Sequence, residues 1–477
     1  MGLPRIIQGG MGAGVSNWQL ARAVAIEGQL GVVSGIAMEV IIAQRLAAGD
    51  SGGHIRRALA AFPDQEIAER MVRSYYSDSV FERALARWPR PHRLVDPDAL
   101  LQETIVATFV EIFLAKEGHD NPIGINLLTK IQLPTLAGLY GAMLAGVDYV
   151  IMGAGIPREV PAILDRLAHH EDVSMSIQVE GASADDDFRV HLSPRRLIRN
   201  LPPELNRPWF FPIVSSNLLA TMMVRKASGR VDGLVVEGPT AGGHNAPPRG
   251  PLALDANREP VYGPKDEVDV PRLAELGLPF YLAGGWGLAG RLREALGLGA
   301  TGVQVGTAFA FCRESGLLAS LKELALYKAA KGFGKVVTDA LASPTGFPFK
   351  VLSIDGTMSE LGEYLSRPRA CNLGFLQHLF KKENGAVGYR CPAEPEATWV
   401  AKGGAPEQVE GRKCLCNGLL ANLGLAPEHA SGYLEKPLIT VGNAFEQLRE
   451  LIRAYGESYS ARDVIAYLMS DLTPQRT

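Results

Sequence analysis

The sequence predicts an α/β protein: a (β/α)8 TIM barrel with a helical insertion after strand 2 and a mostly helical C-terminal extension. Three observations support this fold class. Short apolar, β-branched runs recur between residues 5 and 305, helix-like segments separate most of them, and several runs open into glycines at their carboxyl ends. Strands that alternate with helices form parallel sheets, and eight such strands close a barrel of this kind.

Eight runs fit the strand pattern. In chain order they are Arg5–Gly14, Leu30–Gly35, Ile123–Leu128, Tyr149–Gly155, Trp209–Ser216, Gly233–Gly238, Pro279–Ala283 and Gly302–Val305. The clearest helices between them are Asn17–Glu27, Gln132–Ala145, Val160–His169 and Leu218–Lys226. A doubly wound open sheet is the alternative.

Two segments interrupt this rhythm. Residues 48–120 predict a helical insertion, with amphipathic helices near Gln65–Tyr75 and Leu100–Lys116. Further on, Ser174–Val179 and Phe188–Leu192 fit an inserted hairpin, although the pattern there is ambiguous.

The alternation of strands and helices is lost from about Ser343. We therefore expect residues 1–350 to form the barrel domain and residues 351–477 to form a helical extension that carries cysteines.

Composition excludes several classes of function. The 477 residues carry a net charge of −3, and no block of basic residues stands out, which argues against nucleic acid as a partner. No apolar run reaches the ~18 residues of a membrane span, and no secretory signal is recognisable. The expectation is a cytoplasmic enzyme that binds a small molecule. A homodimer is one assembly that the sequence leaves open.

The carboxyl ends of the predicted strands are rich in small residues. In such barrels ligands bind at these ends, where the chain places Gln8, Gly10, Met11, Asn126, Ser215, Gly242, Gly243, Gly284, Gly285, Gly306 and Thr307. Backbone N–H groups of glycine loops can hold a phosphate, and small residues let a flat ring approach the backbone. Flavin mononucleotide (FMN) has these features, so these residues are candidates for binding it. Turn formation alone is the alternative explanation for the glycines.

His244 follows two of these glycines. An imidazole near neutrality at a strand end suits proton transfer, which makes His244 the candidate catalytic residue. A structural hydrogen bond is the alternative role. His54, in a second Gly-Gly-His within the insertion, is expected to be structural or to lie at the rim.

Four cysteines lie in the extension, namely Cys371, Cys391, Cys414 and Cys416. A zinc or iron–sulfur site needs converging thiolates, and only the last two have short spacing. Free thiols are therefore favoured over a metal site.

Together these stretches resemble the nitronate monooxygenase family, which shares its FMN-binding barrel with enoyl reductases of fatty acid and polyketide synthesis. The matching stretches are Ile6–Met11, Ala241–His244, Ala283–Gly285 and Leu298–Thr307. The resemblance covers about residues 4–350. Two departures are Thr240, where the family often has an acidic residue, and Asn245, near which it has glycine.

The resemblance implies which residues do what. The FMN phosphate would lie near Gly284, Gly285, Gly306 and Thr307, and the ring near Gln8, Gly10, Met11 and Asn126. Gln304, within the last matching stretch, joins the expected cofactor-binding set. His244 would act on the substrate.

Three functions follow. The first is oxidation of a small nitronate-like substrate by oxygen through FMN. The second is an enoyl-thioester reductase that takes electrons from NAD(P)H, because the long insertion and extension look more like synthase-associated reductases. The third is a non-enzymatic scaffold whose cysteine-bearing extension binds a metal or a partner.

Overall fold

The computed structural model describes residues 2–77 and 88–472. Its centre is a parallel eight-stranded sheet in the order β1-β10-β9-β8-β7-β4-β3-β2. The strands are β1 (Ile6–Gln8), β2 (Gly31–Ser34), β3 (Ile123–Leu128), β4 (Tyr149–Gly153), β7 (Trp209–Val214), β8 (Leu234–Glu237), β9 (Phe280–Ala283) and β10 (Gly302–Val305). A parallel bridge between Ile7 and Leu30 joins the first and last strands of this order. The predicted (β/α)8 barrel is thus confirmed, with all eight strands in the predicted runs.

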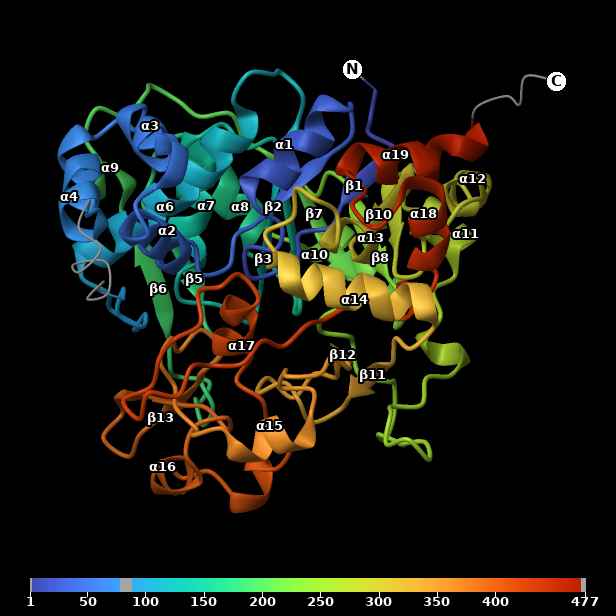
Figure 1. The fold of residues 1–477 in the computed structure, drawn as a ribbon. Helices are drawn as coiled ribbons and strands as arrows, with labels where there is room; N and C mark the ends of the chain where they lie inside the picture. Colours follow the sequence, from blue (N-terminus) through green and yellow to red (C-terminus); the bar gives the residue numbers. More distant parts are fainter. Residues whose placement is uncertain (1, 78–87, 473–477) are drawn as a thin grey trace.

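Helices surround the barrel (Figure 1). Between residues 18 and 331 they are α1 (Trp18–Ile26), α2 (Met38–Ala47), α3 (His54–Ala60), α4 (Gln65–Tyr75), α6 (Asp98–Lys116), α7 (Thr135–Leu144), α8 (Val160–Ala168), α9 (Pro194–Leu197), α10 (Asn217–Lys226), α11 (Val270–Ala274), α12 (Arg291–Gly297), α13 (Thr307–Ala310) and α14 (Ala319–Lys331). None of the described helices is both long and apolar enough to cross a membrane.

Apolar side chains from alternate positions of the strands fill the barrel interior. These interior residues are Ile7, Leu30, Val32, Tyr149, Ile151, Phe211, Val235, Tyr281 and Ala283. Residues two apart on a strand face the same side. Glu237, two residues beyond Val235, therefore faces the interior at the carboxyl end of β8. The strand register pairs Glu237 with Ala283 and Ala283 with Gln304, so these three residues form one layer across β8, β9 and β10.

Both interruptions of the strand pattern have the predicted character. Helices α3, α4 and α6 occupy the insertion after β2, while its residues 78–87 lie outside the described part. The long helix α6 is buried along most of its length, because it packs on α7. The segments β5 (Val173–Ser176) and β6 (Arg189–Leu192) form the antiparallel hairpin.

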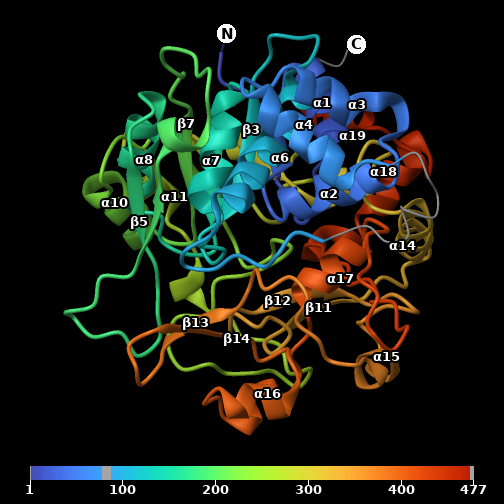
Figure 2. The ribbon, with the colours of Figure 1, turned by 90° about the vertical axis from the view of Figure 1, so that its left-hand side faces the viewer.

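Residues 336–442 gather at one end of the barrel, whereas residues 448–469 pack beside it against α1, α12 and α14 (Figures 1 and 2). They contain two antiparallel hairpins, formed by β11 (Val336–Asp339) with β12 (Phe349–Leu352) and by β13 (His378–Lys381) with β14 (Val387–Arg390). The helices are α15 (Leu361–Ser366), α16 (Glu396–Ala401), α17 (Leu415–Ala421), α18 (Leu448–Tyr455) and α19 (Ala461–Met469). The first hairpin spans the expected boundary at residue 350. We call residues 351–477 the C-terminal extension.

A buried ion pair organises the middle of the extension. The Arg367 guanidinium donates to both carboxylate oxygens of Glu435, at 2.5 and 2.9 Å. The same carboxylate accepts the Asn417 amide at 3.1 Å and lies 3.0 Å from His429 Nε2. Breaking such a buried pair leaves an uncompensated charge. This network therefore ties three distant parts of the extension into one unit.

A second buried charged group lies within the insertion, between α4 and α6. His92 Nδ1 is 2.5 Å from Asp96 Oδ2, and His92 Nε2 is 3.3 Å from Glu39 Oε1 on α2. Burial lowers the pKa of His92, but the hydrogen bonds and charges of Asp96 and Glu39 outweigh it and raise that pKa from 6.5 to about 9. The imidazolium is thus the form that this fold stabilises.

We predict that the free energy of unfolding decreases at alkaline pH, because this imidazolium then loses its proton. Because its pKa is raised by folding, its contribution is complete below pH 6.5 and is lost as the pH rises through about 9. The thermal midpoint of the wild type should fall over that range, by an amount worth on the order of 2 kcal/mol. His92→Gln should be less stable at neutral pH but show a flatter profile. His191→Gln, at an exposed histidine of β6, is the control, and parallel profiles for His92→Gln and wild type would contradict the prediction.

Candidate functional site

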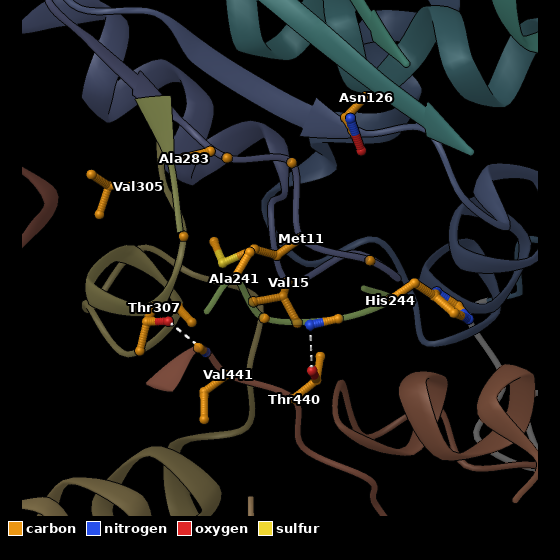
Figure 3. Close-up of a pocket in the computed structure, with 18 of the residues that line it drawn as sticks. Met11, Val15, Asn126, Ala241, His244, Ala283, Val305, Thr307, Thr440 and Val441 are labelled. Carbon is orange, nitrogen blue, oxygen red and sulfur yellow. Dashed lines mark hydrogen bonds between the residues drawn. The ribbon is translucent and has the colours of Figure 1, made fainter. Parts of the chain in front are cut away.

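One cavity of about 260 Å³ lies at the carboxyl ends of the barrel strands (Figure 3). Most of the candidate residues line it, although they come from loops up to three hundred positions apart. The candidates in its wall are Gly10, Met11, Asn126, Gly242, Gly243, His244, Gly284, Gly285, Gln304, Gly306 and Thr307. The fold therefore brings these residues to one place, as a parallel barrel requires.

Two candidates do not line the cavity. Gln8 is fully buried beneath it, where its side chain bonds Ser16 Oγ at 2.7 Å and accepts the Val32 N–H at 3.0 Å. Ser215 lies at the end of β7, and its carbonyl accepts Arg249 at 3.2 Å. The Gln8 amide makes hydrogen bonds where β1 meets β2. The residue therefore supports the cavity from below and does not line its wall.

Glycines form the part of the wall where a phosphate was expected. Gly284 and Gly285 adopt φ of +85° and +76°, a region that side chains disfavour. Their N–H groups bond no other group among the described residues. A Cβ at Gly306 would approach only Met11, at 3.7 Å, so it would project into the cavity. At these positions a ligand could therefore approach the backbone closely and meet N–H groups that are free to donate.

A strap from the C-terminal extension, residues 440–443, completes the wall beside these glycines. The Gly243 N–H donates to Thr440 Oγ1 at 2.7 Å, and the Gly442 N–H donates to Thr307 Oγ1 at 2.9 Å (Figure 3). A Cβ at Gly242 would come within 2.8 Å of the Val441 backbone. The loops after β8 and β10 are therefore held together by the strap from the far end of the chain.

The extension also supplies much of the apolar wall. Its side chains in the cavity include Phe375, Leu376, Leu415, Cys416, Leu419, Ile439, Leu448 and Leu451. Nothing in the sequence pattern of the strands pointed to this cover, because it depends on contacts between distant segments.

His244 lies in the cavity wall, packed edge-on against the Phe349 ring at 4.9 Å between centroids. His244 Nε2 lies 2.7 Å from Ser343 Oγ, and among the described residues no group bonds Nδ1. Burial lowers the pKa of His244 to about 4, and the charge of Lys130 adds to this shift. The imidazole is therefore neutral at physiological pH, and one of its nitrogens is available to a ligand.

The charge balance of the cavity is unusual for an anion site. Of the described residues in its wall, none is lysine or arginine, and the single carboxyl group is that of Glu237. Backbone N–H groups and the hydroxyls of Thr307 and Thr440 are the donors that could meet a phosphate. Strand-end glycines made this part predictable from the sequence.

Two cavity residues carry buried polar atoms without a partner. Gln304 Oε1, in the wall from β10, and Gln447 Oε1, in the wall from the extension, bond nothing among the described residues. Buried acceptors are normally paired, so both oxygens indicate that a ligand donates to them. Such a set of neutral donors and acceptors fits a ring with amide-like edges.

The four late cysteines are free thiols. Among the described residues no three histidine, cysteine or acidic side chains are arranged to hold a metal ion. A hydrogen bond from Cys391 lowers the pKa of Cys371 to about 7, while Cys416 lines the cavity. His54 lies in the insertion, with its ring 5.2 Å from that of Trp18, and does not line the cavity.

Comparison with known proteins gives one family. Residues 209–339, from β7 to β11, match the family model of nitronate monooxygenase. A search of curated proteins finds no match to this chain.

Three solved structures are among those to which the chain is similar. FabK from Thermotoga maritima is 18% identical, with a TM-score of 0.47, over 98% of this chain and 92% of that one. A nitroalkane oxidase from Streptomyces ansochromogenes is 16% identical, with a TM-score of 0.47, over 98% and 95%. The enoyl reductase domain of MlnA from the macrolactin cluster of Bacillus amyloliquefaciens is 12% identical, with a TM-score of 0.46, over 98% and 95%.

The family match covers three of the four stretches on which the resemblance was based, namely Ala241–His244, Ala283–Gly285 and Leu298–Thr307, whereas Ile6–Met11 lies outside it. The chain is therefore an oxidoreductase enzyme whose residues 209–339 are similar to the nitronate monooxygenase family.

Proposed function

We propose that this protein is an FMN-dependent oxidoreductase that oxidises a small nitronate-like substrate with oxygen. The observation that carries the proposal is a cavity whose wall combines open glycine N–H groups, partnerless amide oxygens and one neutral histidine. The family match over residues 209–339 supports the same reaction class. FMN would supply the acceptor of two electrons and their transfer to oxygen.

We assign the cofactor to the strand ends. Gly284, Gly285, Gly306 and Thr307 would hold the phosphate through N–H and hydroxyl donors, since no cationic side chain of the described wall is available. Gly10, Met11, Asn126 and Gln304 would border the ring. In this proposal residues 1–350 bind the cofactor, and the C-terminal extension covers the site.

His244 would act on the substrate. Its low pKa leaves the imidazole neutral, so it can accept a proton from the substrate or orient its polar group. Ser343 at Nε2 fixes the ring, and Phe349 holds its orientation. The apolar side chains of the extension would exclude water from the reacting carbon.

A second candidate is an enoyl-thioester reductase that uses NAD(P)H. One observation favours it: the apolar wall formed by Ile36, Leu128, Ile131, Phe375, Leu376, Leu415 and Leu419 is larger than a nitronate of a few atoms needs, and it suits an acyl chain.

An air-free visible spectrum distinguishes these functions. The purified protein should show a flavin band that an alkyl nitronate bleaches and that NADPH leaves unchanged. Rapid bleaching by NADPH would identify the reductase instead. Protein that carries no flavin and binds no added FMN would contradict both.

The phosphate assignment predicts the effect of a side chain at Gly285. Gly285→Val should abolish FMN binding, because the new side chain meets the cavity donors and the φ of +76° disfavours it. Gly277→Val is the matched control, since Gly277 has φ of +72° but lies on an exposed turn outside the cavity. Flavin content after gel filtration measures both. Full FMN occupancy in Gly285→Val would remove this loop from the phosphate site.

The role of His244 predicts a split between binding and turnover. His244→Ala should retain FMN but lower kcat/KM by about 10²-fold or more, the usual contribution of a general base. His191→Ala on exposed β6 should match the wild type. Because His244 titrates near 4, its ionisation should cause no loss of activity between pH 5.5 and 7. Unchanged turnover in His244→Ala would exclude it from the chemistry.

A further inference from the structure

Two cysteines of the C-terminal extension lie against each other. The Cys391 thiol donates a hydrogen bond to the Cys371 sulfur, although the hairpin of β13 and β14 separates the two residues in the chain. Both are free thiols, and the described residues around them are not arranged to hold a metal ion. The chemistry proposed for the cavity uses neither of them.

The hairpin places one cysteine beside the other. It pairs His378 of β13 with Arg390 of β14, and Gln377 and Cys391 are the residues just outside this pair (Figure 2). The Gln377 side-chain amide donates to Cys371 Sγ at 3.6 Å. The residue next to the open end of the hairpin therefore binds the first cysteine, where the second one leaves β14.

Hydrogen bonds on the other side of the pair hold the same two segments together. The Arg369 guanidinium, two residues before Cys371, donates to the carbonyl of Pro392, the residue after Cys391, at 3.4 Å. The Cys391 N–H donates to Glu394 Oε1 at 3.1 Å, which fixes the turn after β14. The contact between the two sulfurs is thus supported from both sides by bonds that involve neither thiol proton.

The two thiols differ in reactivity. Cys371 is partly exposed, and the hydrogen bond from Cys391 lowers its pKa, helped by the charge of Lys402 and opposed by burial and by Glu394. Cys391 is buried, and its hydrogen bond to Cys371 together with burial raises its pKa. Because the thiolate is the nucleophilic form of cysteine, Cys371 is the thiol that reacts first and Cys391 supplies the second sulfur.

The other two cysteines of the extension are less suited to this role. Burial raises the pKa of Cys414 to about 12 and that of Cys416 well above its usual value. Both thiols therefore keep their protons at neutral pH. Among the cysteines, the one whose thiol donates to the Cys371 sulfur is Cys391.

The pair lies next to a segment of the cavity wall. Phe375 and Leu376, between Cys371 and Gln377, both line the cavity. Hydrogen bonds hold this segment against Cys391 in the reduced protein. A covalent bond between the two sulfurs would join the start of the segment directly to the end of β14.

We propose that Cys371 and Cys391 are a redox-active pair that hydrogen peroxide converts into a disulfide, and that this bond fixes residues 371–377 of the cavity wall. The inference is independent of the proposed function, because neither thiol needs a flavin to react.

The reaction has two steps. The Cys371 thiolate attacks one oxygen of the peroxide and the O–O bond breaks, which gives a sulfenic acid and a hydroxide that takes up a proton to become water. The Cys391 sulfur then attacks the Cys371 sulfur. The S–O bond breaks, the S–S bond forms, and the hydroxyl leaves with the Cys391 proton as a second water. The two thiols lose two electrons, and the peroxide gains them.

The test is to count thiols in the full-length protein after treatment with near-stoichiometric hydrogen peroxide and blocking with N-ethylmaleimide. The wild type should lose two of its five thiols, and digestion without reductant should yield a peptide cross-linked through Cys371 and Cys391. Dithiothreitol should restore both thiols. Retention of all thiols, or a cross-link to Cys414 or Cys416 instead, would overturn the inference, and this measurement depends on no variant.

Variants identify the role of each sulfur. Cys391→Ser should form no disulfide and should accumulate a sulfenic acid on Cys371, which dimedone labels. Cys371→Ser should lose thiols at least about tenfold more slowly, because the remaining thiols are protonated. Cys414→Ser, which removes a neighbouring thiol outside the pair, is the matched control and should form the disulfide as the wild type does. Oxidation of Cys371→Ser at the wild-type rate would contradict the assignment.

Amide hydrogen exchange tests the effect on the cavity wall. In the oxidised wild type, the amides of residues 372–377 should exchange about tenfold more slowly than in the reduced protein, because the cross-link restricts local opening. Cys391→Ser treated with the same peroxide should show no such change. Equal exchange in the two states of the wild type would overturn the claim that the disulfide fixes this segment.

Discussion

The hydrogen bonds between the strap, residues 440–443, and the loops after β8 and β10 are the constraint on which the site depends. Gly243 donates to Thr440, Gly442 donates to Thr307, and the Asn443 N–H donates to the Thr240 carbonyl at 3.0 Å. Small residues at Gly242 and Gly442 allow the two backbones to approach each other so closely. The barrel alone would leave these loops open to solvent, so the extension is part of the site and not an addition to it.

The extension can hold this position because a buried charged network links its segments. The Arg367–Glu435 pair lies out of contact with water and is supported by Asn417 and His429. Such a pair contributes little net stability but penalises any arrangement that separates its members. It thus favours one conformation of the segments that flank α17, and α17 in turn carries Leu415, Cys416 and Leu419 to the cavity.

The cavity works with neutral groups. Burial keeps His244 uncharged and gives Glu237 a pKa raised to about 8, and no basic side chain among the described residues lines the wall. Hydrogen-bond donors in a site of low dielectric interact strongly with charge that develops on a ligand. A flavin-like cofactor with one phosphate and one redox-active ring suits such a wall, because each part can be bound by backbone N–H groups and neutral side chains.

Local pattern in the sequence determined the barrel and much of its rim. Each strand is a short β-branched run, and each of Gly242, Gly284 and Gly306 follows such a run, so their common position follows from the parallel fold alone. Only the tertiary structure decided that the strap completes the wall, that Gln8 lies beneath it, and that Glu237 has no partner. The physical reason is that these properties depend on packing between segments distant in the chain, such as Gly242 against Val441, and on the burial that this packing produces. The residues next to a position in the sequence do not determine this packing or this burial.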